Sequence, residues 1–396
     1  MVPAIAHTPP GTPAPFVDRE RERGLLREHL DVALAGCGGT VLVGGEAGIG
    51  KSALVEALGR EAADRGALVL GGGCYDLTET PPYGPWRESF RRGAALAREA
   101  PALAGIRLPD FADAAGRDAL LAEACGAVVA LTDHAPLVLV LEDLHWADPA
   151  SLDLLRVLAR EAPALPLLLL ATYRADELPR RHPLALLLPV LAREAGAARL
   201  DLRRLPAAAL AALVAAHYRV TAGDGERLAA HLLGRAGGNP FFSLQLLHAL
   251  EEDGVLRPSG DGWTVGKLER ASLPPSLRQV VDARLARLDE AGQALLETAA
   301  VIGQEVPFGL WAAVAGRAEE ELFAVAEAAV RARLVEPTPD GAGIAFAHAL
   351  VREALYEGLL PFRRREAHRR VGEALGALAD PDPDAVARHF RQAGDP

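Results

Sequence analysis

Eight residues near the amino terminus have the types and spacing of a phosphate-binding loop. The pattern G-x-x-x-x-G-K-[ST] is matched by Gly45, Glu46, Ala47, Gly48, Ile49, Gly50, Lys51 and Ser52. Glycines let the backbone turn several N–H groups toward one anion, and the positive end of the following helix faces the same anion. Lys51 would reach the β- and γ-phosphates of a nucleotide, and the Ser52 hydroxyl would bind Mg²⁺. These residues therefore predict a P-loop.

The segments on either side of this loop have the patterns that phosphate binding requires. Residues 40–43 form a short apolar run with β-branched side chains, typical of a strand, and residues 53–58 have the pattern of a helix. A glycine-rich structural turn is the alternative interpretation. The order strand, loop, helix favours the phosphate-binding interpretation, because the mechanism needs the loop between those two elements.

Two acidic residues follow a second apolar run. Residues 137–141 predict a buried strand, which Glu142 and Asp143 follow directly. A P-loop enzyme needs one acid in the Mg²⁺ shell and another to orient or activate the attacking water. Position favours Glu142 for the metal and Asp143 for the water, but the two roles could be exchanged, because related enzymes carry Asp first. Two acids that cap a strand in a turn are the structural alternative.

Asp143 is followed by Leu144-His145-Trp146-Ala147-Asp148-Pro149. This segment contains polar residues that could line a site and residues that are typical of the start of a helix. Asp148 is interpreted as a helix N-cap, because Pro149 suits the first helical position. Trp146 is interpreted as a packing residue. His145 could line the site or serve the packing, and the sequence leaves both open.

A third apolar run ends in an arginine. Residues 167–172 predict another buried strand, and Tyr173 and Arg174 follow it. Arg174 could sense or stabilise the charge of the γ-phosphate, because a guanidinium binds phosphate oxygens well. The alternative is a surface arginine that begins a loop.

Strand-like runs alternate with helical patterns from residue 16 to about residue 201. The candidate strands are residues 40–43, 67–70, 137–141, 167–172 and 199–202. These runs are continuously apolar, as expected for a parallel sheet that is covered on both faces. The alternation predicts a doubly wound α/β domain whose ligand lies at the carboxyl ends of the strands.

The pattern becomes mainly helical after residue 205. Helices are predicted at residues 206–218, 225–235, 240–253 and 275–288, and the chain is helical again from about residue 363. A turn at residues 260–262 suggests a small hairpin, and residues 334–346 suggest another. Helices with one such hairpin favour a winged-helix module.

Composition narrows the class of protein. A chain of 396 residues, half of them hydrophobic, is long enough for about two to four domains. The net charge of −11 argues against nucleic-acid binding by the chain as a whole, so the arginines of residues 363–370 are interpreted as a solvated helix face or an interdomain contact. Three distant cysteines disfavour disulfides and zinc and fit a reducing cytoplasm. No apolar run reaches the roughly 18 residues of a membrane span.

Several motifs occur in the order found in one family. The chain resembles the ATPase module of STAND-class signalling ATPases, in particular the AAA-type module of large LuxR-family (MalT-like) transcriptional regulators. The resemblance is carried by F-V-D-R-E (16–20), the Walker A loop (45–52), L-V-L-V-L-E-D-L-H-W-A-D (137–148), A-T-Y-R (171–174), G-N-P-F-F (238–242) and F-A-H-A-L-V-R-E-A-L-Y (346–356). Asp18 and Glu142 stand where the family has Gly and Asp.

The resemblance implies three further site residues. Arg19 belongs to the motif that contacts the nucleotide's base and ribose. Pro240 belongs to the lid motif whose proline packs on adenine, although a proline that begins a helix is an equal alternative. His348 corresponds to a histidine that meets the β-phosphate of ADP in relatives, although a lone histidine in an apolar stretch is more often a core residue.

The resemblance also implies a domain order. It predicts a P-loop NTPase domain at residues 16–204, a helical lid at 205–272 and a winged-helix domain at 273–362. Residues 1–15, with five prolines, are predicted from their composition to be a disordered tail. Residues 363–396 would begin a helical, TPR-like region.

The function implied is a nucleotide switch with ATP or ADP and Mg²⁺ as its ligands. The winged helix would hold an ADP-bound resting state, exchange for ATP would permit self-association in response to an unknown inducer, and slow hydrolysis would reset the switch. DNA would be bound only through C-terminal domains that this chain lacks. The alternatives are a stand-alone P-loop enzyme, such as a kinase or remodelling ATPase, and a nucleotide-binding scaffold that does not hydrolyse.

Overall fold

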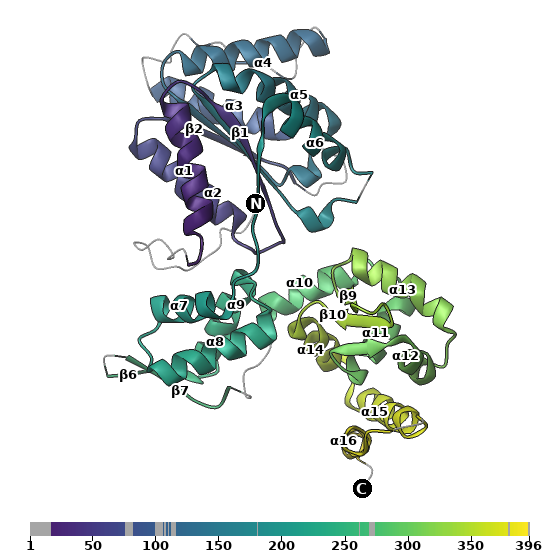
Figure 1. The fold of residues 1–396 in the computed structure, drawn as a ribbon. Coiled ribbons are helices and arrows are strands. Elements are labelled where there is room, and N and C mark those ends of the chain that lie inside the picture. The colour runs from purple at the N-terminus through teal and green to yellow at the C-terminus, as the bar shows by residue number, and fades with distance from the viewer. Residues whose placement is uncertain are drawn as a thin grey trace. The chain divides into compact units, whose positions relative to one another are not determined.

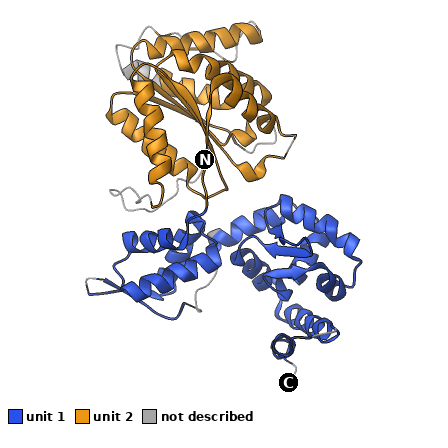
Figure 2. Cartoon of the chain, viewed as in Figure 1, with its two compact units in different colours: residues 1–15, 204–396 blue, residues 16–203 orange. Residues whose placement is uncertain are grey.

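The chain forms two compact units. The computed structural model describes residues 17–75, 82–99, 106, 108–109, 111, 116–179, 181–260, 262–268, 274–378 and 381–394. One unit lies within residues 16–203 and the other within residues 204–396 (Figures 1 and 2). The predicted tail at residues 1–15 lies outside the described residues, and the predicted boundaries of the lid, winged helix and C-terminal region stay predictions.

The N-terminal unit is built on a parallel five-stranded sheet (Figure 1). Its strands are β1 (Gly39–Gly44), β2 (Leu68–Gly73), β3 (Leu137–Glu142), β4 (Leu167–Tyr173) and β5 (Ala198–Asp201), and their order is β2-β3-β4-β1-β5. All four pairings are parallel. The five predicted strands are confirmed, each to within a few residues at its ends.

Helices cover both faces of this sheet. They are α1 (Glu20–Leu34), α2 (Lys51–Asp64), α3 (Gly84–Glu99), α4 (Arg117–Thr132), α5 (Pro149–Glu161) and α6 (Pro183–Ala195). Successive side chains of a strand point to opposite faces, so Val41 and Val43 join the core under α1 and α2, whereas Leu42 joins the core on the other face. This two-sided burial confirms the doubly wound P-loop fold, and it explains why the strands read as continuously apolar.

The C-terminal unit begins with three helices and a hairpin. These elements are α7 (Ala207–His217), α8 (Ala222–Ala236), α9 (Pro240–Glu252), β6 (Leu256–Ser259) and β7 (Gly262–Val265). The two strands pair antiparallel, which confirms the predicted hairpin around residue 260. Asp261 at its tip lies outside the described residues.

A small sheet surrounded by helices follows. The elements are α10 (Pro275–Leu285), α11 (Glu290–Ile302), β8 (Glu305–Pro307), α12 (Phe308–Ala315), α13 (Glu319–Arg331), β9 (Val335–Pro337), β10 (Gly343–Phe346) and α14 (Ala349–Gly358). The three strands form an antiparallel sheet in the order β8-β10-β9. From α11 to β10 the chain runs through one helix, one strand, two helices and two strands, which is the arrangement of a winged helix. The hairpin of β9 and β10 was predicted; β8 was not, because three residues are too short to show a strand pattern.

The last two described helices, α15 (Pro361–Gly376) and α16 (Pro383–Ala393), pack against each other around two histidines. The Nδ1 atoms of the buried His368 and His389 lie 2.9 Å apart, and the Tyr356 hydroxyl lies 3.0 Å from Nε2 of His368. One ring must donate and the other accept, so the accepting imidazole must be neutral. In the same helix Arg369 and Arg370 are exposed and pair with Glu366, which fits a solvated helix face.

Stability of this helix pair is expected to fall in acid. Burial, the charge of His368 and the charge of Arg388 lower the pKa of His389 to about 4, below the unfolded value near 6.5. The folded chain therefore binds fewer protons, and this contribution, on the order of 1–3 kcal/mol, is present above about pH 6.5 and lost as the pH falls through about 4. Urea unfolding of wild type and His389→Gln at several pH values checks this. The free-energy difference should widen as pH rises, and parallel profiles would contradict it.

None of the helices that the structure describes is both long and apolar enough to cross a membrane.

Candidate nucleotide-binding site

The P-loop lies between β1 and α2, as the sequence predicted. Gly45, Gly48 and Gly50 have φ angles of +149°, +76° and +102°, a region that side chains with a Cβ rarely adopt. A Cβ on Gly45 would also come within 2.9 Å of Ile49 Cγ2. The glycines are therefore required by the loop's own conformation, and Glu46 and Ala47 occupy the positions where other side chains fit.

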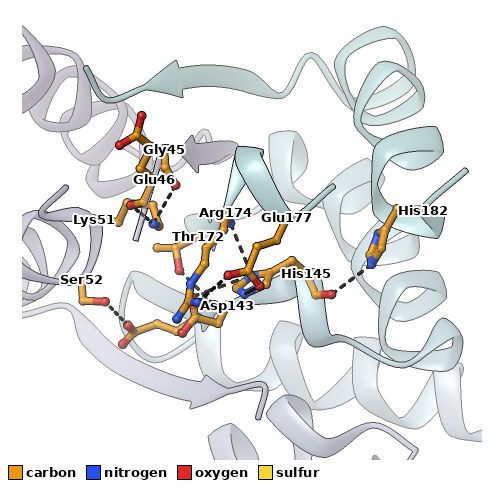
Figure 3. A network of polar contacts seen from close by, with 11 residues as sticks. Gly45, Glu46, Lys51, Ser52, Asp143, His145, Thr172, Arg174, Glu177 and His182 are labelled. Carbon is orange, nitrogen blue, oxygen red and sulfur yellow. Dashed lines mark hydrogen bonds and ion pairs between the residues drawn. The ribbon is translucent and has the colours of Figure 1, made fainter. Parts of the chain in front are cut away.

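Lys51 is folded back into the loop that precedes it. Its ammonium group donates to the carbonyl oxygens of Gly45 and Glu46, each at 2.8 Å, and the side chain is buried (Figure 3). Burial lowers the pKa of Lys51, while the charge of Asp143 raises it and that of Arg174 lowers it. The Lys51 charge therefore lies within the phosphate loop, close enough to Asp143 and Arg174 for their charges to act on it.

Ser52 and Glu142 converge from elements far apart in the sequence. The Ser52 hydroxyl donates to Glu142 Oε2 at 2.6 Å, which joins the start of α2 to the end of β3. Both are oxygen ligands of the kind that Mg²⁺ prefers, and this ion is commonly held by one or two protein oxygens together with substrate phosphates. No cluster of three or more His, Cys, Asp or Glu that could hold a metal occurs among the described residues. The pair fits a magnesium ion shared with a nucleotide.

Asp143 is held in an unusual backbone conformation. Its φ of +57° lies in the left-handed region, which Asp tolerates better than most residues, and its N–H donates to Thr172 Oγ1 at 3.0 Å. Burial raises the pKa of Asp143, although the charges of Arg174 and Lys51 oppose this. A carboxylate that is partly desolvated in this way is a stronger base than one in water. Thr172, at the end of β4, was not singled out from the sequence.

Arg174 contacts the acidic residues of the site. Its Nη1 lies 2.7 Å from Glu177 Oε1, and its Nε lies 3.9 Å from Asp143 Oδ1 (Figure 3). Its guanidinium lies over the Trp146 ring, 4.6 Å from the ring centroid. The structure therefore brings Arg174 close to Asp143, and its role toward the γ-phosphate stays a prediction.

His145 and Asp148 have structural roles in this network. The His145 ring is buried, its Nδ1 accepts the Arg174 N–H at 3.3 Å, and burial lowers its pKa to about 3, so the ring is neutral. Asp148 accepts the N–H of Ser151 at 2.9 Å and begins α5, which confirms the predicted N-cap. Asp148 also accepts the Tyr83 N–H at 3.1 Å.

Arg19 lies beside the P-loop. Its buried side chain donates to the carbonyl oxygen of Arg203 at 2.7 Å and to that of Ile49 at 3.4 Å. Asp18, which stands where the family motif has Gly, has a φ of +55°, so the left-handed turn is kept. The structure thus places Arg19 against the phosphate loop, and its contact with a base or ribose stays a prediction.

Pro240 and His348 lie in the C-terminal unit. Pro240 is the first residue of α9, and the Asn239 side chain caps that helix, which confirms the helix-start interpretation. His348 is buried, with its ring edge-on to Phe242 at 5.1 Å between centroids, and burial lowers its pKa to about 3. Its Nδ1 has no hydrogen-bond partner among the described residues. Their contacts with adenine and ADP stay predictions.

Two residues that the sequence did not single out complete the network. Glu177 pairs with Arg174, and His182 Nε2 donates to the His145 carbonyl oxygen at 3.0 Å (Figure 3). Glu177 lies three residues after Arg174, a spacing at which side chains of one helical turn meet. This three-residue spacing is the one sequence signal that could have identified Glu177. It becomes informative only once the helical turn after Arg174 is known.

Comparison with known proteins agrees with this geometry. Residues 15–170 match the family model of the AAA ATPase domain. An uncharacterised protein of Rhizobium meliloti (strain 1021) is 27% identical over 96% of this chain. The chain spans only 39% of that relative's length.

Solved structures share the fold. A Walker-type ATPase of Pyrococcus abyssi aligns with a TM-score of 0.52 and 15% identity over 86% of this chain and 96% of that chain. A STAND protein with a tetratricopeptide repeat sensor from Pyrococcus horikoshii aligns with a TM-score of 0.35 and 17% identity over 96% of this chain and 48% of that chain. The first likeness concerns the fold, and the second is too loose to add to it. Residues 15–170 thus match an AAA ATPase domain, within a unit that has the P-loop fold and brings the candidate site residues together.

Proposed function

We propose that this chain binds and hydrolyses ATP and acts as the nucleotide switch of a signal-responsive, LuxR-type transcriptional regulator. The observation that carries the ATPase part is the convergence of Lys51, Ser52, Glu142, Asp143 and Arg174 at the carboxyl ends of three parallel strands. The match of residues 15–170 to the AAA ATPase domain supports it independently.

Each residue has a distinct role in the proposed hydrolysis. The loop amides and Lys51 bind the β- and γ-phosphates. Ser52 and Glu142 hold the magnesium ion, which when bound neutralises charge on the phosphate oxygens. Asp143, the partly desolvated carboxylate, accepts the proton of the attacking water. Arg174 then stabilises the negative charge on the transferred phosphoryl group.

The switch part of the proposal rests on the resemblance and on the elements that come after the P-loop unit. A winged helix and a further helical pair succeed that unit along the chain, as in the regulators that the motifs resemble. A ligand shifts such a switch only by its different affinity for the two states, so ATP and ADP must favour different conformations. We propose that the ATP state self-associates, that an inducer biases the exchange, and that DNA is bound by domains outside this chain.

The mass of the purified protein in two nucleotide states tests the switch. We expect larger species with a non-hydrolysable ATP analogue and Mg²⁺ and not with ADP, because only the ATP state would expose the self-associating surface. Light scattering after size-exclusion chromatography measures this, with nucleotide-free protein as the control. Equal masses in all states would favour a non-hydrolysing scaffold, whereas large rings with both nucleotides and fast turnover would favour a remodelling ATPase.

A further inference from the structure

The Glu177 carboxylate lies between two groups of the candidate site. The turn η4 (Ala175–Glu177) returns the chain toward Arg174, and the Glu177 N–H donates to the Arg174 carbonyl oxygen at 3.2 Å. One carboxylate oxygen, Oε1, lies 2.7 Å from Arg174 Nη1. The other, Oε2, lies 3.5 Å from Nε2 of the neutral His145 ring, without a hydrogen bond between them (Figure 3). The Glu177 side chain is therefore bonded to the arginine and lies next to the buried histidine.

The His145 ring is itself held from two sides. Its Nδ1 accepts the Arg174 N–H, so in the neutral ring the proton is on Nε2, the nitrogen nearest Glu177. The His145 carbonyl oxygen accepts from Nε2 of His182, which in turn caps α6 through its Nδ1. The buried His145 residue therefore contacts Arg174, which follows β4, and His182, which caps α6.

These contacts restrain Arg174 at both its backbone and its side chain. His145 binds the N–H, Glu177 binds the guanidinium, and the Trp146 ring covers one face of it. The Arg174 charge opposes the rise of the Asp143 pKa and lowers the Lys51 pKa, so it acts on both residues of the phosphate site. A free arginine side chain would have many rotamers, and an electrostatic stabiliser works best when its position is fixed before the reaction.

We propose that Glu177 is a positioning residue for ATP hydrolysis, which fixes the Arg174 guanidinium beside Asp143 while His145 accepts a hydrogen bond from the Arg174 backbone. This inference rests on the proposed ATPase function. Glu177 need not touch the nucleotide, because it acts through Arg174.

Steady-state ATPase assays of Glu177→Gln, Arg174→Ala and the double variant test the proposal. Arg174→Ala should lower kcat about 100-fold and Glu177→Gln about tenfold, because a misplaced group loses part of its effect. KM should change less than about twofold, because both residues are proposed to act in the transition state and not in the binding of ATP before the reaction. The double variant should match Arg174→Ala, because Glu177 has no effect without its arginine.

Glu194→Gln is the matched control, because Glu194 forms a comparable ion pair with Arg156 at 2.8 Å on α6, outside the site. It should leave kcat unchanged. An unchanged or raised kcat in Glu177→Gln would overturn the proposal, as would an equal loss in the wild-type and Arg174→Ala backgrounds.

Fluorescence separates this inference from the ATPase proposal. The Trp146 emission, obtained as the difference between each protein and its Trp146→Phe variant, should change in Glu177→Gln because the guanidinium leaves the ring. It should not change in Glu194→Gln. If wild type fails to hydrolyse ATP, the proposed function is lost, and the fluorescence still shows whether Glu177 holds Arg174. An unchanged Trp146 emission would overturn that contact.

Discussion

Replacing Lys51 with alanine is expected to abolish detectable ATP binding. The ammonium group is buried inside the loop and would exchange its bonds to the Gly45 and Glu46 carbonyls for phosphate oxygens. Removing one partner of a buried, hydrogen-bonded charge pair costs about 2–5 kcal/mol, or roughly 30- to 4000-fold in Kd. Isothermal titration of ATP and Mg²⁺ into wild type and Lys51→Ala measures this.

The chain offers a matched control for this substitution. Lys267 is the other lysine of the sequence, and it is exposed in the C-terminal unit. Lys267→Ala should bind ATP as wild type does, which separates the loss of a general positive charge from the loss of the loop's own cation. Tight ATP binding by a folded Lys51→Ala protein would refute the assignment of the P-loop.

Replacing Asp143 with asparagine is expected to stop hydrolysis while ATP binding survives. Asparagine keeps the size of the side chain but cannot accept the proton of water, and general-base catalysis contributes about 10²–10⁴-fold. The Asp143 N–H bond to Thr172 comes from the backbone, so the left-handed turn should persist, and asparagine tolerates that region as well as aspartate does. Single-turnover assays of radiolabelled ATP measure the chemical step directly.

Comparison with Glu142→Gln assigns the two acids. Because Glu142 lies 2.6 Å from the Ser52 hydroxyl, its loss should raise the Mg²⁺ concentration needed for the half-maximal rate. Asp143→Asn should leave that concentration unchanged and lower the rate. Asp153→Asn, an exposed carboxylate on α5, serves as a control with wild-type rates. Equal activity of Asp143→Asn and wild type would remove Asp143 from the mechanism, and the reverse pattern would exchange the two roles.

Much of the phosphate site could be predicted because its signals are local. The P-loop is eight consecutive residues, and its glycines are required by the φ angles of the loop itself. The approach of Glu142 and Arg174 to this loop was also predictable in outline, since parallel strands place their carboxyl ends at one edge of the sheet. The contact of Ser52 with Glu142 follows from that rule, although 90 residues separate them.

Other features gave no such signal. The sequence left His145 open, and it did not distinguish Glu177 from its neighbour Asp176 as the partner of Arg174. That choice depends on the turn η4 and on the buried ring beside it. In the same way β8 is too short for a periodic pattern and exists because β10 pairs with it.

The sequence by itself determined the five strands of the parallel sheet, the phosphate loop and the two acids at the end of β3, because these depend on periodicity and on the conformations that neighbouring residues allow. Only the tertiary structure decided the strand order β2-β3-β4-β1-β5 and the network of Arg174, Glu177 and His145. The physical reason is that these features depend on which faces of the elements pack together. Packing brings together residues that are far apart in the sequence, and such contacts leave no local sequence pattern.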